Sequence, residues 1–309
     1  MVAVQVDGAY MSYWLYQHLG NLSPEELGKN ELWRQVRESA DGARALRDHA
    51  FRADQRADGI RWSFRRDYGG VRVVAIDSRS RRVLEPGRRL MTDDAEWQWV
   101  TESMSGHWDH VVLATSLPLL LAHGIHGMEA WNEAVCDGAW GSVARAGERA
   151  RRAVDLEHWA AFWQSFTRFE QLLIELAAGT RDTPPKAVTV IAGDVHHSCL
   201  AAADAGEPGN GAVHQAVCSP IHNVLPDRFQ RLHRLASSRA GALAGAALAR
   251  LGAAPRPSIG WRITDGPWFQ NMLATLEFDG HAARIRFDGA AQDPDGTQGL
   301  GLVGEIRLT

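Results

Sequence analysis

The stretch VTVIAGDVHHSCL, residues 188–200, joins the pattern of a buried strand to a cluster of polar side chains. Its Val and Ile residues favour a short interior strand, because β-branched side chains suit a pleated surface that is packed on both faces. The strand pattern breaks at Gly193. The polar residues that follow are Asp194, His196, His197 and Ser198. In open α/β sheets ligands bind beyond the carboxyl ends of the strands, so we expect chemistry at this position.

Three other short apolar runs end in polar residues in the same way. VRVVAI (71–76) is followed by Asp77, Ser78 and Arg79, VVLA (111–114) by Thr115 and Ser116, and AVHQAV (212–217) by Cys218, Ser219, His222 and Asn223. Parallel strands of one sheet would bring all four ends to a common rim.

Asp and His at such a rim predict a metal site. Asp oxygens and His nitrogens are ligands for zinc, manganese and iron, and carboxylates alone suit calcium. Two such metals can clamp a phosphate and activate a water. The competing interpretation is structural, because a His at a strand end often only hydrogen-bonds to backbone.

Composition limits the other function classes. The 309 residues are 45% hydrophobic and 23% charged, which is typical of a soluble globular protein. We find no apolar run of about 20 residues and no basic leader followed by an apolar segment, so we expect a cytoplasmic chain without a membrane span. Three Cys without CxxC spacing favour a reducing compartment. The net charge of -4 argues against a nucleic-acid-binding module.

Local signals predict several further elements. Ser23 and Pro24 mark a helix start, and Gly69-Gly70 a hairpin turn. We expect an acidic-start helix within 91–104, one amphipathic helix across 151–179 and an Ala/Gly-rich helix within 237–255. The chain then closes with a hairpin about Asp279-Gly280 and a strand at 304–309. The fold class expected is α/β, or α+β.

The motif IAGDVHHS (191–198) resembles the Gly-Asp-Val-His-x-Ser signature of the alkaline phosphatase D family, the PhoD-like metallophosphatases. The resemblance extends in order over AYMSYWLYQHLGNLSPEEL, VVAIDSR, MTDDAEWQWV, LATSLPLLL, EAWNEAVCDGAWG, DLEHWAAFWQSF and VCSPIHN. It implies a calcineurin-like metallophosphoesterase fold, a β-sandwich flanked by helices. It also implies hydrolysis of phosphate mono- or diesters at a multinuclear centre of calcium and iron.

The resemblance also suggests roles for single residues. Asp194 and His196 would be metal ligands, and His196, His197 and Arg79 are the expected catalytic residues. The residues expected around the substrate are Asp77, Ser198, His222 and Asn223. Zinc or manganese would also be accepted by an Asp and His site.

One departure from the family pattern limits the expected activity. The family's upstream acidic motifs, which supply most metal ligands, have no counterpart before Tyr10. We therefore expect residues 1–309 to be the carboxy-terminal part of such a domain, with a helical entry (1–60), a core (61–225) and a final helix and hairpin (226–309). Even a catalytic zinc commonly has three protein ligands, so we expect a phosphoesterase that is inactive or weakly active as this chain. An uncovered sheet edge would favour self-association.

Two alternatives remain open. The chain could serve as a non-catalytic binding or scaffold remnant of the fold. It could also be a complete enzyme with a mononuclear site built from Asp194, His196, His197 and His222.

Overall fold

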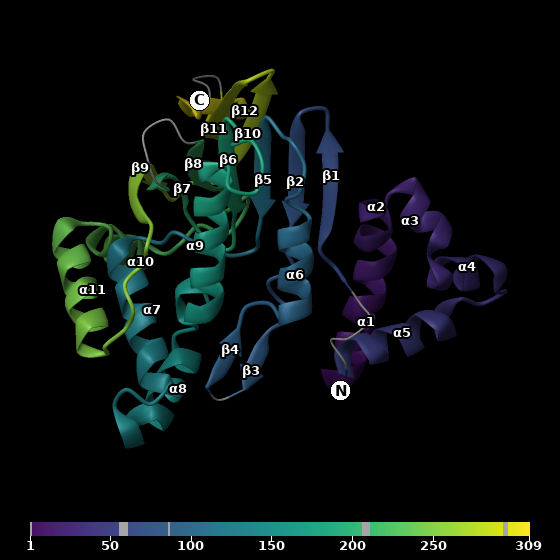
Figure 1. Cartoon of the computed structure of the whole chain (residues 1–309), viewed down its shortest axis with the longest axis horizontal. Helices are drawn as coiled ribbons and strands as arrows, with labels where there is room; N and C mark the ends of the chain where they lie inside the picture. Colours follow the sequence, from purple (N-terminus) through teal and green to yellow (C-terminus); the bar gives the residue numbers. More distant parts are fainter. Residues whose placement is uncertain (1, 56–60, 86, 206–210, 293–295) are drawn as a thin grey trace. The chain divides into compact units, whose positions relative to one another are not determined.

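The structure is a computed structural model that describes residues 2–55, 61–85, 87–205, 211–292 and 296–309 (Figure 1). The chain divides into two compact units, Met1–Phe64 and Arg65–Thr309. Each unit has its own cluster of buried apolar side chains. No helix within the described ranges is both long enough and apolar enough to cross a membrane.

The first unit is helical. Its elements are α1 (Val2–Tyr13), the π-helical turn η1 (Trp14–His18), α2 (Leu19–Asn21), α3 (Pro24–Lys29), α4 (Glu31–Glu38) and α5 (Ala43–Gln55). The helix start predicted at Ser23 is confirmed, because Ser23 and Glu26 form a reciprocal capping box at the start of α3. Trp14, Leu32, Leu46 and Trp62 form its buried core.

The second unit is built on a sheet of seven strands. In spatial order these are β1 (Phe64–Tyr68), β2 (Val71–Ala75), β5 (His110–Ala114), β6 (Ala187–Ala192), β8 (Ala212–Val217), β7 (Ser198–Asp204) and β9 (Gly260–Trp268). Strands β2, β5, β6 and β8 are parallel neighbours. Strand β7 runs antiparallel to both β8 and β9. The four polar strand ends predicted to share one rim therefore do lie at the same edge of the sheet.

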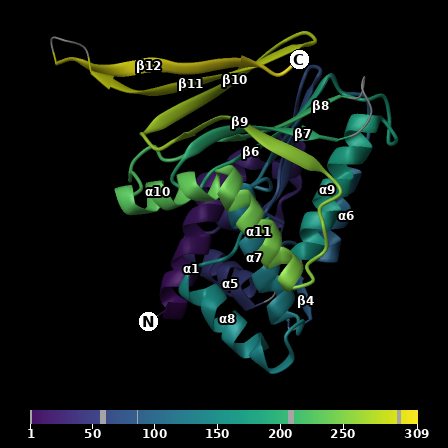
Figure 2. The same cartoon turned by 90° about the vertical axis from the view of Figure 1, so that its left-hand side faces the viewer.

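Helices cover one face of this sheet (Figures 1 and 2). They are α6 (Asp94–Glu102), α7 (His123–Cys136), α8 (Ala144–Ala153), α9 (Trp163–Ala178), α10 (Asp227–Ala236) and α11 (Arg239–Leu251), with 3-10 turns η2 (Gly141–Val143) and η3 (Trp159–Ala161). Phe166 and Phe169 of α9 pack with Val188 and Val190 of β6 in the largest buried cluster. The helices predicted within 91–104 and 237–255 are confirmed as α6 and α11.

A second sheet covers the other face over β7 and β8 (Figure 2). Its antiparallel strands are β10 (Met272–Asp279), β11 (Ala282–Gln292) and β12 (Gln298–Arg307). Ile285 and Phe287 of β11 pack against Leu200 and Ala216. A small hairpin of β3 (Val83–Glu85) and β4 (Arg88–Leu90) completes the unit. The mixed α/β fold class is confirmed, as are the hairpins at Gly69-Gly70 and Asp279-Gly280.

The prediction of one helix across 151–179 is wrong. Helix α8 ends at Ala153, Asp155 adopts a positive φ of 53°, and α9 begins only at Trp163. Between them Trp159 is fully buried, and its indole N–H donates to the Thr115 hydroxyl and the Leu117 carbonyl, both at 3.2 Å. Anchoring this indole beside the end of β5 requires the chain to leave the helix. The predicted stop at Gly179 is confirmed by its left-handed C-cap conformation.

Candidate functional site

The loops after β2 and β6 meet through the side chain of Arg79. One amino group of its guanidinium donates to Asp194, and the other donates to both carboxylate oxygens of Glu157, at 2.8 and 2.9 Å. Asp77 and Asp194, which follow two different strands, thus belong to the same rim. Arg79 is therefore paired with two carboxylates in this conformation.

Asp77 orders the loop that carries Arg79. One of its carboxylate oxygens accepts the backbone N–H groups of Arg79 and Ser80, both at 2.9 Å, and the other accepts the Ser80 hydroxyl. The neighbouring Ser78 hydroxyl lies 2.7 Å from that of Ser116, which links the ends of β2 and β5. Asp77 is therefore engaged with its own loop.

His196 is anchored through one ring nitrogen, and the other has no hydrogen bond within the described residues. Its Nδ1 lies 2.9 Å from the Asn223 carbonyl oxygen. A carbonyl only accepts, so Nδ1 is the donor, and in the neutral ring Nε2 keeps a lone pair. The backbone φ angles of Asp194 and His196 are 64° and 55°, which is the left-handed region. This sharp turn brings both side chains to one pocket.

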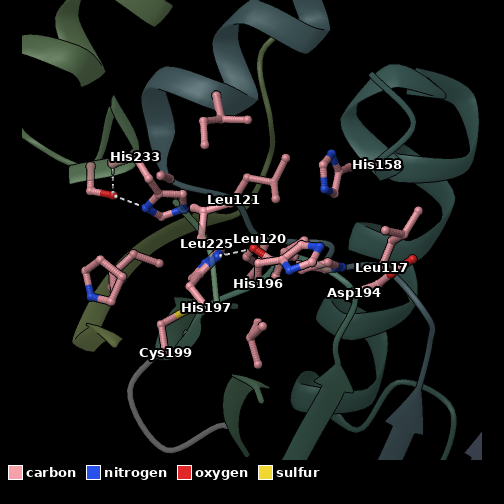
Figure 3. A pocket seen from close by; sticks show the side chains of 18 of the residues that line it. Leu117, Leu120, Leu121, His158, Asp194, His196, His197, Cys199, Leu225 and His233 are labelled. Carbon is pink, nitrogen blue, oxygen red and sulfur yellow. Dashed lines mark hydrogen bonds between the residues drawn. The ribbon is translucent and has the colours of Figure 1, made fainter. Parts of the chain in front are cut away.

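The pocket has a volume of about 440 Å³, and polar and apolar side chains alternate around it (Figure 3). Its polar residues include Asp194, Glu157, His158, His196, His197 and His233. Its apolar residues include Leu117, Leu120, Leu121 and Leu225. The rings of His197 and His233 pack with centroids 4.0 Å apart.

The pKa values of the histidines in this pocket are shifted in different directions. Burial lowers the pKa of His197 to about 4 and that of His233 to about 3, so both are neutral at pH 7. Burial also opposes a charge on His158, but the carboxylate of Glu129, 2.6 Å from its Nδ1, outweighs this and raises the pKa of His158. The Glu129 side chain is fully buried. The pocket therefore combines two neutral imidazoles with one imidazole whose pKa is raised.

The other residues predicted to contact substrate are placed differently. The Ser198 hydroxyl is buried, donates to the Ser219 carbonyl at 3.2 Å and accepts the Ser219 N–H at 3.1 Å. Asn223 takes part through its backbone carbonyl. His222 is exposed and does not line this pocket.

Sequence reasoning missed the pocket residues Glu157, His158 and His233. It also missed Glu129, which bonds to His158. Glu157 and His158 lay inside a segment expected to be plain amphipathic helix. Glu129 and His233 come from helices distant in the sequence from the strand ends. An adjacent Glu-His pair just after a helix end was the one local signal.

The described side chains do not fit a multinuclear metal centre by themselves. In the part of the chain that the structure describes, no group of three or more His, Cys, Asp or Glu side chains is placed to hold a metal ion. Asp194 is paired with Arg79, and only Nε2 of His196 is left open by the contacts of that ring.

Comparisons with known proteins give one structural similarity. No protein-family model and no curated protein matches the chain. A solved structure of PhoD is similar with a TM-score of 0.43 and 11% sequence identity, over 88% of this chain and 51% of that chain. The chain thus spans about half the length of the solved structure that it matches.

Proposed function

We propose that this chain is a phosphoesterase-type protein whose rim carries part of a metal-dependent hydrolytic site for phosphate mono- or diesters. Asp194 and His196 are the proposed ligands, and they would need further ligands to hold a metal tightly. The observation that carries the proposal is that Arg79, Asp194 and His196 meet beside one pocket at the carboxyl edge of a parallel sheet.

The chemistry of these groups supports that proposal. The exposed carboxylate of Asp194 and the lone pair on Nε2 of His196 are metal-binding atoms. The hydrogen bond from Nδ1 to the Asn223 carbonyl fixes the ring, as backbone carbonyls do for metal-bound histidines. Arg79 is held by Glu157 and directs its second amino group at the rim, where a phosphate oxygen would compete with Asp194.

Hydrolysis by the purified chain tests how complete the site is. We expect little turnover of p-nitrophenyl or bis-p-nitrophenyl phosphate with calcium, iron, manganese or zinc, because two ligands are fewer than catalytic metal sites commonly have. Robust metal-dependent turnover that disappears in His196→Ala would contradict this and favour the complete mononuclear enzyme.

Calorimetric titration with Mn²⁺ separates the proposal from a non-catalytic scaffold. We expect weak binding, with a dissociation constant above about 10 μM, that is lost in Asp194→Ala because that change removes one of only two ligands. The matched control is Asp204→Ala, an exposed carboxylate at the end of β7. Identical heats for the parent chain and Asp194→Ala would support the scaffold.

A further inference from the structure

A second pocket, of about 460 Å³, lies between α7, α11 and the segment that leads into β9. It shares no lining residue with the pocket at the rim. The residues that matter for its chemistry are His126, Ala130, Ala246, Arg250, Arg256 and Trp261. Its volume is in the range of about 300–1,000 Å³ that is usual for small-molecule sites.

Small residues create this pocket. At Gly127 a Cβ atom would lie 2.4 Å from the backbone of Gly245, so the two helices are in direct backbone contact there. Alanines further along α7 and α11 leave the groove open. Trp261 forms an aromatic wall whose indole N–H donates to the Leu121 carbonyl at 2.8 Å, so that the ring is fixed in place.

His126 is a buried polar side chain without a partner. It is 5% exposed, and within the described residues neither ring nitrogen has a hydrogen bond. Its ring contacts Phe166 and Trp261, with centroids 5.0 and 4.8 Å away. Burial lowers its pKa to about 3, so at neutral pH it offers one donor and one acceptor. Buried polar groups are normally hydrogen-bonded. His126 lines the pocket, so a ligand there would supply the missing partner if the ring turned to expose one of its two covered nitrogens.

Two cations lie at the same pocket. Arg250 lies in the last turn of α11, and Arg256 follows in the loop before β9; both are exposed. Neither guanidinium has a hydrogen bond or an ion pair in the part of the chain that the structure describes. Unpaired guanidinium groups favour a carboxylate, which they can bind through two parallel hydrogen bonds.

We propose that this pocket binds a small aromatic carboxylate that carries a hydroxyl group. The aromatic body packs against Trp261 and the alanines, the carboxylate pairs with Arg250 and Arg256, and the hydroxyl satisfies His126. The site is independent of the proposed hydrolytic function, since it uses no residue of the rim.

Calorimetry on the whole chain at pH 7.5 tests this, with 6-hydroxy-2-naphthoate as the probe. We expect saturable one-to-one binding that is at least about tenfold tighter than binding of 2-naphthoate, which lacks the hydroxyl, and of 2-naphthol, which lacks the carboxylate. No saturable binding at millimolar probe would overturn the proposal.

Variants of the lining residues test which residues bind the hydroxyl and which bind the carboxylate of the probe. His126→Phe should weaken the hydroxynaphthoate about tenfold and leave 2-naphthoate unchanged, because only the hydroxyl partner is removed. The double variant Arg250→Gln with Arg256→Gln should weaken both acids and leave 2-naphthol unchanged. Arg239→Gln, an exposed arginine at the opposite end of α11, is the control. Equal affinities across these variants would overturn the proposal, and the arginine variants decide the matter if His126→Phe does not fold.

Discussion

Asp194 and His196 both adopt the left-handed backbone conformation, which costs an L-residue roughly 1–2 kcal/mol. Asp tolerates this region better than most residues because its short side chain can hydrogen-bond locally. In this turn the ion pair with Arg79 and the hydrogen bond to the Asn223 carbonyl counter the cost. Such backbone is concentrated at functional sites, so the turn itself supports a functional role for the rim.

Acid should destabilise the protein through His126. Its folded pKa, about 3, is below the ordinary 6.5 of an unfolded histidine, so the unfolded state binds more protons between these values. The free energy of unfolding therefore falls as pH drops through this window. From pH 7.5 to pH 5 this residue alone contributes a loss of roughly 2 kcal/mol, which we expect His126→Phe to abolish.

Urea unfolding at the two pH values measures this difference. The parent chain should lose more stability than His126→Phe, while both retain the acid sensitivity of the buried His197 and His233. His107→Gln, which changes an exposed histidine, should behave like the parent. An equal loss in the parent and in His126→Phe would show that His126 is hydrated or charged in the folded state.

At the rim, the sequence indicates position where a polar residue directly follows a buried strand. Asp194 and His196 lie beside a pocket at that edge, and their roles stay predictions. The partner of the Ser198 hydroxyl is the backbone of a loop after another strand, a contact that no local pattern indicates. His233 could not be found, since only the packing of α10 brings its ring to His197.

Among the elements, α7 and α11 depend on glycine where their backbones touch. We expect Gly127→Ala to lower the free energy of unfolding by about 1–3 kcal/mol, because the added methyl group would meet backbone atoms of Gly245 at 2.4 Å and the helices must separate. Urea unfolding of the variant measures the loss.

Gly28→Ala is the matched control for this prediction. A Cβ at Gly28, inside α3, would meet nothing within 4 Å. Alanine has the higher helix propensity, so we expect this variant to be neutral or up to about 1 kcal/mol more stable. If the two variants have the same effect, backbone contact between α7 and α11 is not what requires glycine.

Strands were predicted from the sequence where their side chains are of types that are enriched in strands. The parallel strands β2, β5, β6 and β8 were found because Val and Ile are enriched in buried strands. Strands β7 and β9 were not expected, since SCLAAAD is rich in Ala and GWRITDGPW contains Gly and Pro, all of which are depleted in strands. Strand β7 enters the sheet by pairing with β8, and β9 enters it by pairing with β7. Pairing of this kind is not visible in local propensity.

At the scale of the second unit, alternation along the strands builds three layers. In β7, Leu200 faces the three-stranded sheet and Ala201 faces the helices. In β8, Ala216 faces the three-stranded sheet and Val213 faces the helices. Successive side chains of a strand point to opposite faces, so one strand serves both cores. The rim therefore has a support on each side, the helices on one and β10–β12 on the other.

Phe287 tests whether the second sheet is an integral layer. It is fully buried between β11 and the large sheet, so Phe287→Ala leaves a cavity and should lower the free energy of unfolding by about 3–5 kcal/mol. The control Leu300→Ala truncates a side chain of β12 that is 60% exposed. It should change the free energy of unfolding by no more than about 0.5 kcal/mol. Urea unfolding measures both free energies, and hydrogen exchange shows which strands are affected.

If β10–β12 unfolds together with the large sheet, Phe287→Ala should speed hydrogen exchange in β7 and β8 as well as in β11. Faster exchange confined to β10–β12 would instead mean that this sheet unfolds independently and does not support the rim.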